Sequence, residues 1–343
     1  MYLILAMNED LHADAVLYYL EEAGETVVRI DPERLFLKYG ISPDLEHLNT
    51  ESQKAVAVIT PDSAIIHLGN GRTLDVNQVE GVFCRSFYVP AAKDEDNISD
   101  HLAMSEIKSV FRGFCSMLPP GVRWVNDPYI EDRVDNKIFQ HYSAKRFGIL
   151  IPDTLVTNDS AKAREFFKRH KSGVIIKQLG DISLVEEKPI KTETGEDDVE
   201  VNGFYTSEVT ENDVAEIDDY LTPGSTPILL QEKLIKRSEL RVMVVGDHVF
   251  TYRLFSQENE KTLVDFRKDI DVRSEKAVLP EEEQKKLLAM LKFWGISFAA
   301  CDFVETQDGR TIFLEANVEG NWLWLEEERS PIAKCIADLL RGR

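Results

Sequence analysis

The sequence predicts an α/β domain at the N-terminus, followed by an α+β region. Residues 1–30 read as strand, helix and strand, which is the usual opening of a small parallel sheet. Later in the chain, apolar segments flank the turn sequences Gly246-Asp247 and 306–309, a pattern typical of antiparallel strands. The Pro119-Pro120-Gly121 sequence marks the boundary between the two parts.

Length and composition limit the class of protein. The chain has 343 residues, of which 43% are hydrophobic, so it can bury a sizeable core in two or three domains. The N-terminal sequence lacks the basic start and cleavage site of a signal peptide, and no apolar run approaches a membrane span. We therefore expect a cytoplasmic protein. The four cysteines lie far apart in sequence, which argues against a zinc motif and a disulfide framework and indicates reduced thiols.

The charge of the chain restricts its partners. The formal net charge is −21, which repels a phosphate backbone, so nucleic acid and anionic membranes are not expected as partners. The same charge provides solubility and would also attract a basic peptide segment. Composition alone leaves both interpretations open.

The N-terminal part combines short strands with helices. Its first helix, at 11–23, carries apolar residues on one face and ends at Gly24, which favours helix termination. The opening contains no G-x-G-x-x-G sequence, so a dinucleotide fingerprint is absent and a dehydrogenase is a weak alternative. The remaining elements are a hairpin at 55–68 that leads into Gly69-Asn70-Gly71, a strand at 82–88 that contains Arg85, a polar break at 94–100, and a helix to about residue 118.

The second part begins with alternating helices and strands. The pattern predicts a helix at 131–147, a strand at 151–157, a helix at 160–170 and a strand at 173–178. Residues 179–202 are rich in charged residues, Thr and Gly with little periodicity, which predicts a mobile loop. The region is completed by strands at 204–209, 227–234, 240–245 and 248–255, and by helices at 212–221, 281–294 and 330–340.

Three polar residues interrupt the two apolar strands near the C-terminus. Asp302 lies in the first strand of this predicted hairpin, and Glu315 and Asn317 lie in the second. Residues at positions i and i+2 of a strand point to one face, and the adjacent strand can bring Asp302 beside them. Such a cluster of oxygen ligands suits Mg²⁺ that is shared with the phosphates of a nucleotide. The alternative is a set of solvent-facing acids on an edge strand.

From Lys137 onward, the order of short motifs resembles the ATP-grasp superfamily. The resemblance covers about residues 120–340 and depends on the ordered set Asn136-Lys137, Val174-Ile175-Ile176-Lys177, Leu230-Gln231-Glu232-Lys233-Leu234, Glu239-Leu240-Arg241-Val242, Cys301-Asp302-Phe303 and Leu314-Glu315-Ala316-Asn317. It implies an N-terminal α/β domain at 1–120 that helps to bind substrate. Two α+β subdomains, at 121–225 and 226–343, would clamp ATP between them.

The resemblance also implies roles for single residues. The residues that would bind the nucleotide are Lys137, Lys177, Gln231, Glu232, Lys233, Leu234 and Glu239. Lys137 and Lys177 would contact the phosphates and adenine. The segment 231–234 would offer backbone groups to the adenine edge, and Glu239 would bind the ribose. Arg241 and Arg253 would hold the γ-phosphate or acyl-phosphate oxygens, with a surface salt bridge as the alternative for both. The metal ligands would be Asp302, Glu315 and Asn317. No Walker sequence is present, so phosphate binding depends on the lysines, the arginines, the metal and the 179–202 loop.

Within the superfamily, the sequence is most similar to the maturases of graspetides, which are microviridin-type peptides cross-linked by ω-ester or ω-amide bonds. The similarity lies in residues 5–14, in Asn126-Asp127-Pro128 and in residues 315–326. One strand departs from the expected pattern, because Cys84-Arg85-Ser86-Phe87 stands where an aromatic residue and paired arginines are expected. Arg85 is the candidate substrate contact of that strand.

This resemblance implies an ADP-forming ligase that uses ATP and Mg²⁺. It would activate an Asp or Glu side chain of a ribosomal precursor peptide as an acyl phosphate, which a Ser or Thr hydroxyl or a Lys amine of the same peptide would attack. It would bind the leader of the peptide while the core reacts, and it would be a homodimer. The alternatives are a ligase that adds an amino acid to a protein or small-molecule carboxylate, and a regulatory protein that binds ATP without turnover.

Overall fold

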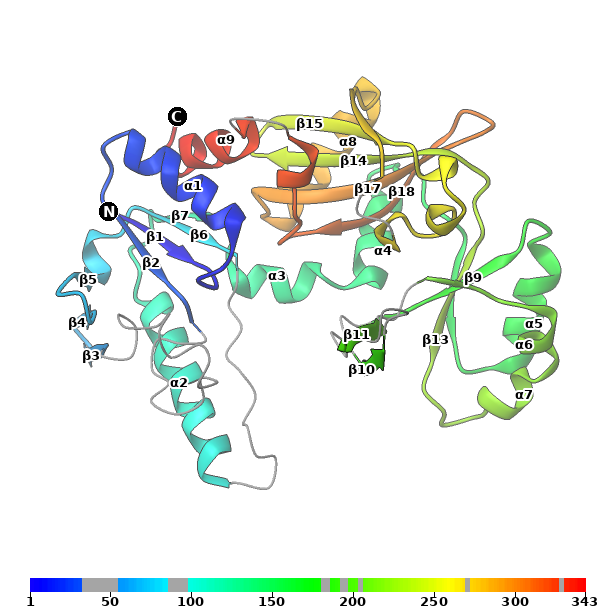
Figure 1. The fold of residues 1–343 in the computed structure, drawn as a ribbon, viewed down its shortest axis with the longest axis horizontal. Helices are drawn as coiled ribbons and strands as arrows, with labels where there is room; N and C mark the ends of the chain where they lie inside the picture. The colour runs from blue at the N-terminus through cyan, green and yellow to red at the C-terminus, as the bar shows by residue number, and fades with distance from the viewer. Residues whose placement is uncertain are drawn as a thin grey trace.

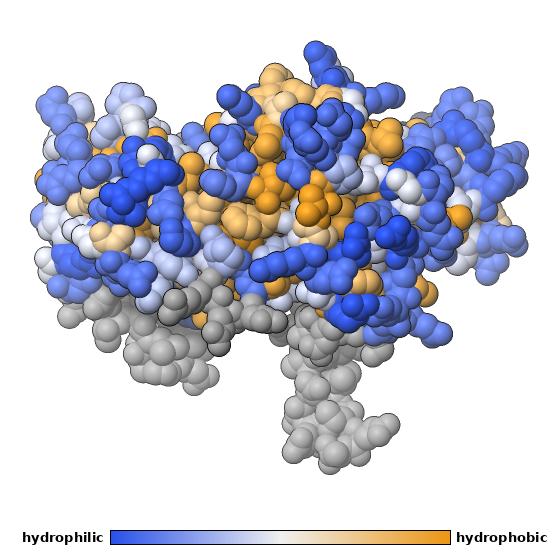
Figure 2. Space-filling model, turned by 90° about the horizontal axis from the view of Figure 1, so that it is seen from above, coloured by the Kyte–Doolittle hydropathy of each residue, from blue (hydrophilic) through white to orange (hydrophobic). Residues whose placement is uncertain are grey.

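The fold is organised around three main sheets, which lie side by side along the molecule (Figure 1). The structure is a computed structural model that describes residues 1–32, 55–85, 98–179, 186–191, 197–202, 206–268, 272–326 and 330–343. Both termini lie at one end of the molecule, and the central sheet lies at the other (Figure 1). Seen from above, apolar surface gathers over the middle of the molecule, and the two ends are mostly hydrophilic (Figure 2).

The N-terminal sheet is parallel, as the βαβ pattern predicted. Its order is β2-β1-β6-β7, with bounds Val27–Ile30, Tyr2–Leu5, Gly81–Cys84 and Arg123–Val125. Alternate side chains of β1 enter two different cores. Tyr2 and Ile4 pack with helices α1 (Leu11–Glu22) and α9 (Pro331–Leu340), and Leu3 and Leu5 pack with α2 (Ile98–Ser116) and with a small antiparallel sheet. That sheet consists of β3 (Val56–Thr60), β4 (Ser63–His67) and β5 (Thr73–Asp75).

The central sheet is antiparallel and carries helices on one face. Its order is β12-β9-β13-β8, with bounds Ser207–Glu208, Val174–Lys177, Ile228–Glu232 and Thr154–Thr157. The helices are α5 (Ser160–Arg169), α6 (Glu211–Ala215) and α7 (Ile217–Tyr220). Buried residues of α5 and α7 form a small core with β9 and β13.

The C-terminal sheet is also antiparallel and has a core on each face. Its order is β16-β15-β14-β17-β18, with bounds Ser274–Ala277, His248–Leu254, Lys236–Val245, Phe298–Thr306 and Thr311–Asn317. One face packs against α8 (Glu281–Trp294) and against α3 (Pro128–Val134) and α4 (Lys137–Arg146). The other face packs against α1 of the N-terminal domain and against the C-terminal helix α9. This packing joins the N-terminal and C-terminal domains in one continuous core.

One buried side chain ties β7 to the C-terminal sheet. The amide of Asn126 donates to Phe298 O at 2.8 Å and to Val318 O at 3.2 Å, and its oxygen accepts from the amides of Ser297 and Phe298 at 2.9 Å each. The side chain is therefore saturated with hydrogen bonds at a buried position, which fixes the start of β17 and the end of β18 relative to β7.

Some predicted elements differ from the structure. The helix predicted at 131–147 is two helices, because Asp135 ends α3 and the Asn136 side chain caps α4 by accepting from Phe139 N at 3.0 Å. The mobile loop predicted at 179–202 contains regular structure in two segments, β10 (Glu186–Lys191) and β11 (Asp197–Asn202), which form an antiparallel hairpin. Backbone pairing overrode the weak periodicity there. The rest of that loop, at 180–185 and 192–196, lies outside the described residues, as do 86–88 of the predicted strand, 94–97 of the polar break and 203–205.

None of the helices in the described ranges combines the length and the apolar character that a membrane crossing requires. Cys84, Cys115 and Cys301 are buried as free thiols, and Cys335 is a partly buried free thiol.

Candidate active site

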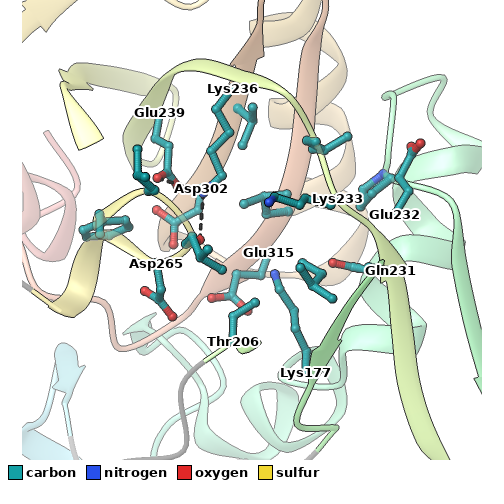
Figure 3. Close-up of a pocket in the computed structure, with 18 of the residues that line it drawn as sticks. Lys177, Thr206, Gln231, Glu232, Lys233, Lys236, Glu239, Asp265, Asp302 and Glu315 are labelled. Carbon is teal, nitrogen blue, oxygen red and sulfur yellow. Dashed lines mark hydrogen bonds and ion pairs between the residues drawn. The ribbon is translucent and has the colours of Figure 1, made fainter. Parts of the chain in front are cut away.

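A pocket lies between the central sheet and the C-terminal sheet (Figure 3). It spans about 670 Å³, which includes the open solvent at its mouth. Its charged lining residues are Lys177, Glu232, Lys233, Lys236, Glu239, Asp265, Arg267, Asp302 and Glu315. Its apolar lining residues are Pro152, Ile175, Leu234, Leu263, Val264, Phe266, Val304 and Leu314. The pocket therefore has a charged part, which suits phosphates and a metal, and apolar walls, which suit a planar base.

The predicted hairpin brings the three predicted metal ligands to one face. Asp302 of β17 is the register partner of Glu315 of β18, and Asn317 follows two residues later, opposite Ala300. A β-bulge follows Asp302, and its position next to the paired acids fits the tendency of bulges to lie beside functional sites. Gln140 of α4 fixes the intervening residue, because its side chain donates to Ala316 O at 2.8 Å and accepts from Ala316 N at 2.9 Å.

The two acids have different electrostatic surroundings. Burial raises the pKa of Asp302 to about 6, although Arg241 donates from Nη1 to both of its oxygens at 3.0 Å. Glu239 and Glu315 add to this rise. Burial alone would raise the pKa of Glu315 as well, but the charges of Lys177, Lys137 and Arg267 outweigh burial and lower it.

These residues fit a magnesium ion that is shared with a nucleotide. Asp302 is buried beside Glu239 and Glu315, and these surroundings raise its pKa despite the contact with Arg241, so a further cation beside the carboxylate would favour its ionised form. Two carboxylates and an amide oxygen are hard ligands of the kind that Mg²⁺ prefers. Within the part of the chain that the structure describes, no three His, Cys, Asp or Glu side chains form a complete metal cluster. The remaining ligands would then be water and phosphate oxygens, which is the usual arrangement for Mg²⁺.

Cationic side chains from separate elements face this acid pair. Lys177 ends β9 and reaches from the central sheet toward Glu315 (Figure 3). Burial lowers its pKa, and the nearby Glu315 opposes that effect. Lys137 is the first residue of α4, and its Nζ lies 3.7 Å from the Glu315 carboxylate. The two lysines thus approach the same acid from separate elements, an arrangement that suits the binding of phosphate oxygens.

The sequence did not predict three further charged residues of the pocket. Lys236 donates to Glu239 at 3.1 Å and to Val264 O at 2.8 Å. Arg267 donates to both oxygens of Asp265, at 2.8 and 2.6 Å, and this hydrogen bonding raises the pKa of the guanidinium. Arg267 lies in the short helical turn Phe266–Lys268, and Asp265 directly precedes that turn. No periodic pattern marks either residue, although a charged Asp-Phe-Arg sequence beside apolar Leu263 and Val264 is a signal that could have been used.

The predicted adenine segment lines the pocket, but part of its backbone is already bonded. The amide of Glu232 donates to Asp153 O and that of Lys233 to Gly173 O, both at 3.0 Å, because the segment ends strand β13. Lys233 also forms an ion pair with Glu208. The side chain of Gln231 is buried and donates to Thr154 Oγ1 at 3.2 Å. Glu232 lines the pocket, and one of its carboxylate oxygens accepts from Asp153 N at 3.0 Å.

The prediction for Arg253 is wrong. Arg253 of β15 lies opposite Leu240 of β14, whereas the pocket residues of β14 are Glu239 and Lys236. Successive strand residues alternate between faces, so Arg253 points away from the pocket. Its guanidinium instead binds Glu305 at 2.9 Å and Glu275 at 3.0 Å. Arg241, which shares a face with Glu239, binds the pocket residue Asp302.

Arg85 also departs from its predicted role as a substrate contact. It is 7% exposed, and its donors bind the protein itself: Asp10 Oδ2 at 3.2 Å, Asn321 Oδ1 at 2.8 Å, Gly320 O at 3.4 Å and Glu319 O. The guanidinium also lies 5.5 Å from the ring centroid of the fully buried Trp322. Because these contacts occupy its nitrogen atoms, Arg85 connects the N-terminal sheet to the turn after β18.

Two α+β subdomains with a pocket between them, paired acids on one sheet and a lysine from the other define an ATP-grasp fold, as the sequence predicted. No protein-family model matches the chain, and a search of curated proteins found no match. Solved structures, however, match it over nearly its whole length.

One of them is a RiPP-associated ATP-grasp ligase of Chryseobacterium gregarium, solved with ADP and a leader and core peptide, with 26% identity over 99% of this chain and 96% of that one and a TM-score of 0.79. Macrocyclase MdnC of Microcystis aeruginosa, bound with precursor peptide MdnA, is 24% identical, and the match covers 100% of this chain and 99% of MdnC with a TM-score of 0.76. Macrocyclase MdnB of the same organism is 25% identical, and the match covers 99% of this chain and 98% of MdnB with a TM-score of 0.73. The predicted likeness to graspetide maturases is therefore confirmed.

Proposed function

We propose that this protein is an ADP-forming ATP-grasp ligase that uses Mg²⁺ and closes rings in a ribosomally made precursor peptide. The observation that carries the proposal is the pocket in which Asp302 and Glu315 of one subdomain face Lys177 of the other. The structural likeness over the full length to peptide ligases, one of them with ADP and a leader and core peptide, supports the same reaction class.

The charged part of the pocket suits the transfer of a phosphoryl group. Asp302, Glu315 and Asn317 would hold Mg²⁺, which supplies Lewis-acid stabilisation to the charge that develops on the phosphates. Lys177 and Lys137, which both approach Glu315, would bind phosphate oxygens and keep them near that acid. Glu315 and Asp302 lie close enough to Arg267 to help raise the pKa of its guanidinium. Arg267 would therefore add a further positive charge beside the phosphates.

The apolar walls and the end of β13 suit the base and the sugar. Ile175, Leu234 and Leu314 provide flat apolar contacts from both subdomains. Since the amides of Glu232 and Lys233 are bonded within the protein, their carbonyls and the Leu234 amide are the groups we assign to the adenine edge. Glu239 would bind the ribose, with Lys236 orienting its carboxylate.

The reaction has two steps. A carboxylate oxygen of an Asp or Glu side chain in the peptide attacks the γ-phosphorus of ATP, and the bond between that phosphorus and the oxygen of ADP breaks. A hydroxyl or amine of the same peptide then attacks the acyl carbon, loses its proton and releases phosphate. The protein contributes positioning and electrostatic stabilisation to both steps.

The proposal includes the partner and the assembly. The partner is a precursor peptide with a leader and a core, and the leader would keep the core at high effective concentration. We further propose a homodimer in the cytoplasm, where the free thiols stay reduced. Size-exclusion chromatography with light scattering tests the dimer, and a monomeric mass at micromolar concentration would contradict it.

The test of the function is an intact-mass measurement on a set of acidic peptides that contain Thr and Lys. Incubation with the protein, ATP and Mg²⁺ should remove one water per ring and release one ADP per ring. A gain equal to one amino-acid residue would instead indicate a ligase that adds an amino acid. Binding of ATP with Mg²⁺ without any ADP release across the peptide set would indicate a regulatory protein.

A further inference from the structure

The turn that follows strand β18 is held by two arginines from different domains. Residues 318–321 connect Asn317, a proposed metal ligand, to the buried Trp322. Arg85 approaches this turn from the N-terminal sheet and donates to Glu319 O, to Gly320 O at 3.4 Å and to Asn321 Oδ1 at 2.8 Å. Three consecutive residues of the turn are therefore bound by one guanidinium.

The second arginine reaches the same turn from the metal side. Arg241 of β14 donates from Nη2 to Asn321 O at 3.1 Å and from Nη1 to both oxygens of Asp302 at 3.0 Å. One guanidinium thus bridges the turn and the buried acid of the pocket. Any displacement of the Asn321 backbone shifts the position at which Arg241 holds Asp302.

The turn also packs directly on the strand that carries Asp302. A Cβ at Gly320 would lie 2.1 Å from Cβ of Ala300 and 3.0 Å from Nη2 of Arg241, so only glycine fits there. Ala300 is the register partner of Asn317, and the Gly320 amide donates to Asn317 O at 3.3 Å. The turn, Asn317 and Arg241 therefore form one closely packed unit.

Arg85 is itself fixed on its other side. Asp10, the N-cap residue of α1, accepts from its Nε at 3.2 Å, and the ring of Trp322 lies beneath the guanidinium. The planar guanidinium with both ends bonded has a defined orientation, which a lysine could not reproduce. The N-terminal domain thus contributes a rigid support to the turn.

We infer that Arg85 is a positioning residue for the magnesium site, acting through the 318–321 turn on Asn317 and on the Arg241 contact to Asp302. The inference rests on the proposed function, because it assigns these residues to a nucleotide-bound magnesium. Mg²⁺ requires near-ideal geometry, and loss of groups that orient metal ligands typically weakens metal affinity about 10-fold to 100-fold.

The test compares ADP binding with and without Mg²⁺, measured by isothermal titration calorimetry. In Arg85→Lys we expect the gain in ADP affinity that Mg²⁺ confers to fall about 10-fold, with the affinity for metal-free ADP unchanged. The exposed Asn321→Ala removes the partner of Arg85 Nη2 and should show the same pattern to a smaller degree. If Arg85→Lys does not fold, the Mg²⁺ dependence of ADP binding in Asn321→Ala tests the inference instead.

The matched control is Arg123→Lys. Arg123 of β7 donates to Leu340 O at 2.5 Å, so it also joins an N-terminal strand to a C-terminal segment, but away from the turn. This variant should keep the Mg²⁺ dependence of the unmodified protein. Unchanged Mg²⁺ dependence in Arg85→Lys and Asn321→Ala would overturn the inference, and so would an equal loss of affinity with and without Mg²⁺. Absence of any Mg²⁺-dependent ADP binding in the unmodified protein would instead contradict the proposed function.

Discussion

At the scale of single residues, the two acids Asp302 and Glu305 of β17 differ because they face opposite sides of one sheet. Asp302 lines the pocket, and Glu305 binds Arg253 on the far face. Asp302→Asn should reduce ADP release more than about 100-fold, because it removes a proposed metal ligand. Glu305→Gln is the matched control and should keep activity within a few-fold. A coupled assay for ADP measures both, and comparable activity in the two variants would contradict the metal assignment.

Glu131 allows a pH prediction at the same scale. It is 7% exposed, one of its oxygens has no hydrogen-bond partner, and burial together with Glu319 raises its pKa to about 9. The folded protein holds a proton that the unfolded chain releases above about pH 4.5, so the free energy of unfolding falls as pH rises from there to about 9.

Glu131→Gln should remove this loss of stability. We expect it to match the unmodified protein near pH 4.5 and to exceed it at pH 8 by on the order of 5 kcal/mol. Urea unfolding at the two pH values measures the difference. The exposed Glu21→Gln on α1 is the control and should show no such trend. A variant that is less stable than the unmodified protein at pH 8 would show that Glu131 is ionised and needed there.

At the scale of elements, the turn after β18 gives a test of packing. Gly320→Ala would bring two Cβ atoms into overlap at Ala300, so we expect a loss of about 1 to 3 kcal/mol. Ala300→Gly removes the atom that the new methyl group meets. The double variant should therefore lose less stability than the sum of the two single losses. Thermal unfolding of the unmodified protein and the three variants measures this difference. Simple additivity would mean that the turn moves away from β17 instead.

The sequence predicted individual elements best where periodicity was strong. The hairpin of β17 and β18 was predicted with Asp302 beside Glu315, because two apolar strands around a Thr-Gln-Asp-Gly turn leave little choice of register. Arg253 was misplaced because the offset between β14 and β15, which sets its face, depends on pairing rather than on local pattern. The β10 and β11 hairpin was missed because its sequence is mostly charged.

At the scale of the whole molecule, the site combines segments that no local pattern connects. Asp265 and Arg267 lie at and within a short helical turn, and Gln140 fixes β18 from a helix 176 residues earlier in the chain. Ordered motifs predicted which fold would bring Lys177 to Glu315, but the neighbours that fill the pocket depend on tertiary packing. The same reason explains why Arg85, predicted as a substrate contact, holds the turn after β18.

The pocket between two subdomains leads to a prediction about the stability of the whole protein. A nucleotide that contacts both β9 and β18 connects the central sheet to the C-terminal sheet, and a ligand at about 100 times its Kd stabilises the folded state by about 2.7 kcal/mol. ADP with Mg²⁺ should therefore raise the Tm of the unmodified protein by several degrees. Lys177→Met should lose most of this shift, because Lys177 is the cation that reaches from the central sheet to Glu315. Lys168→Met, an exposed change on α5 of the same subdomain, is the control and should keep the full shift. An undiminished shift in Lys177→Met, measured by scanning calorimetry, would show that the nucleotide binds without this lysine and would remove the central sheet from the phosphate site.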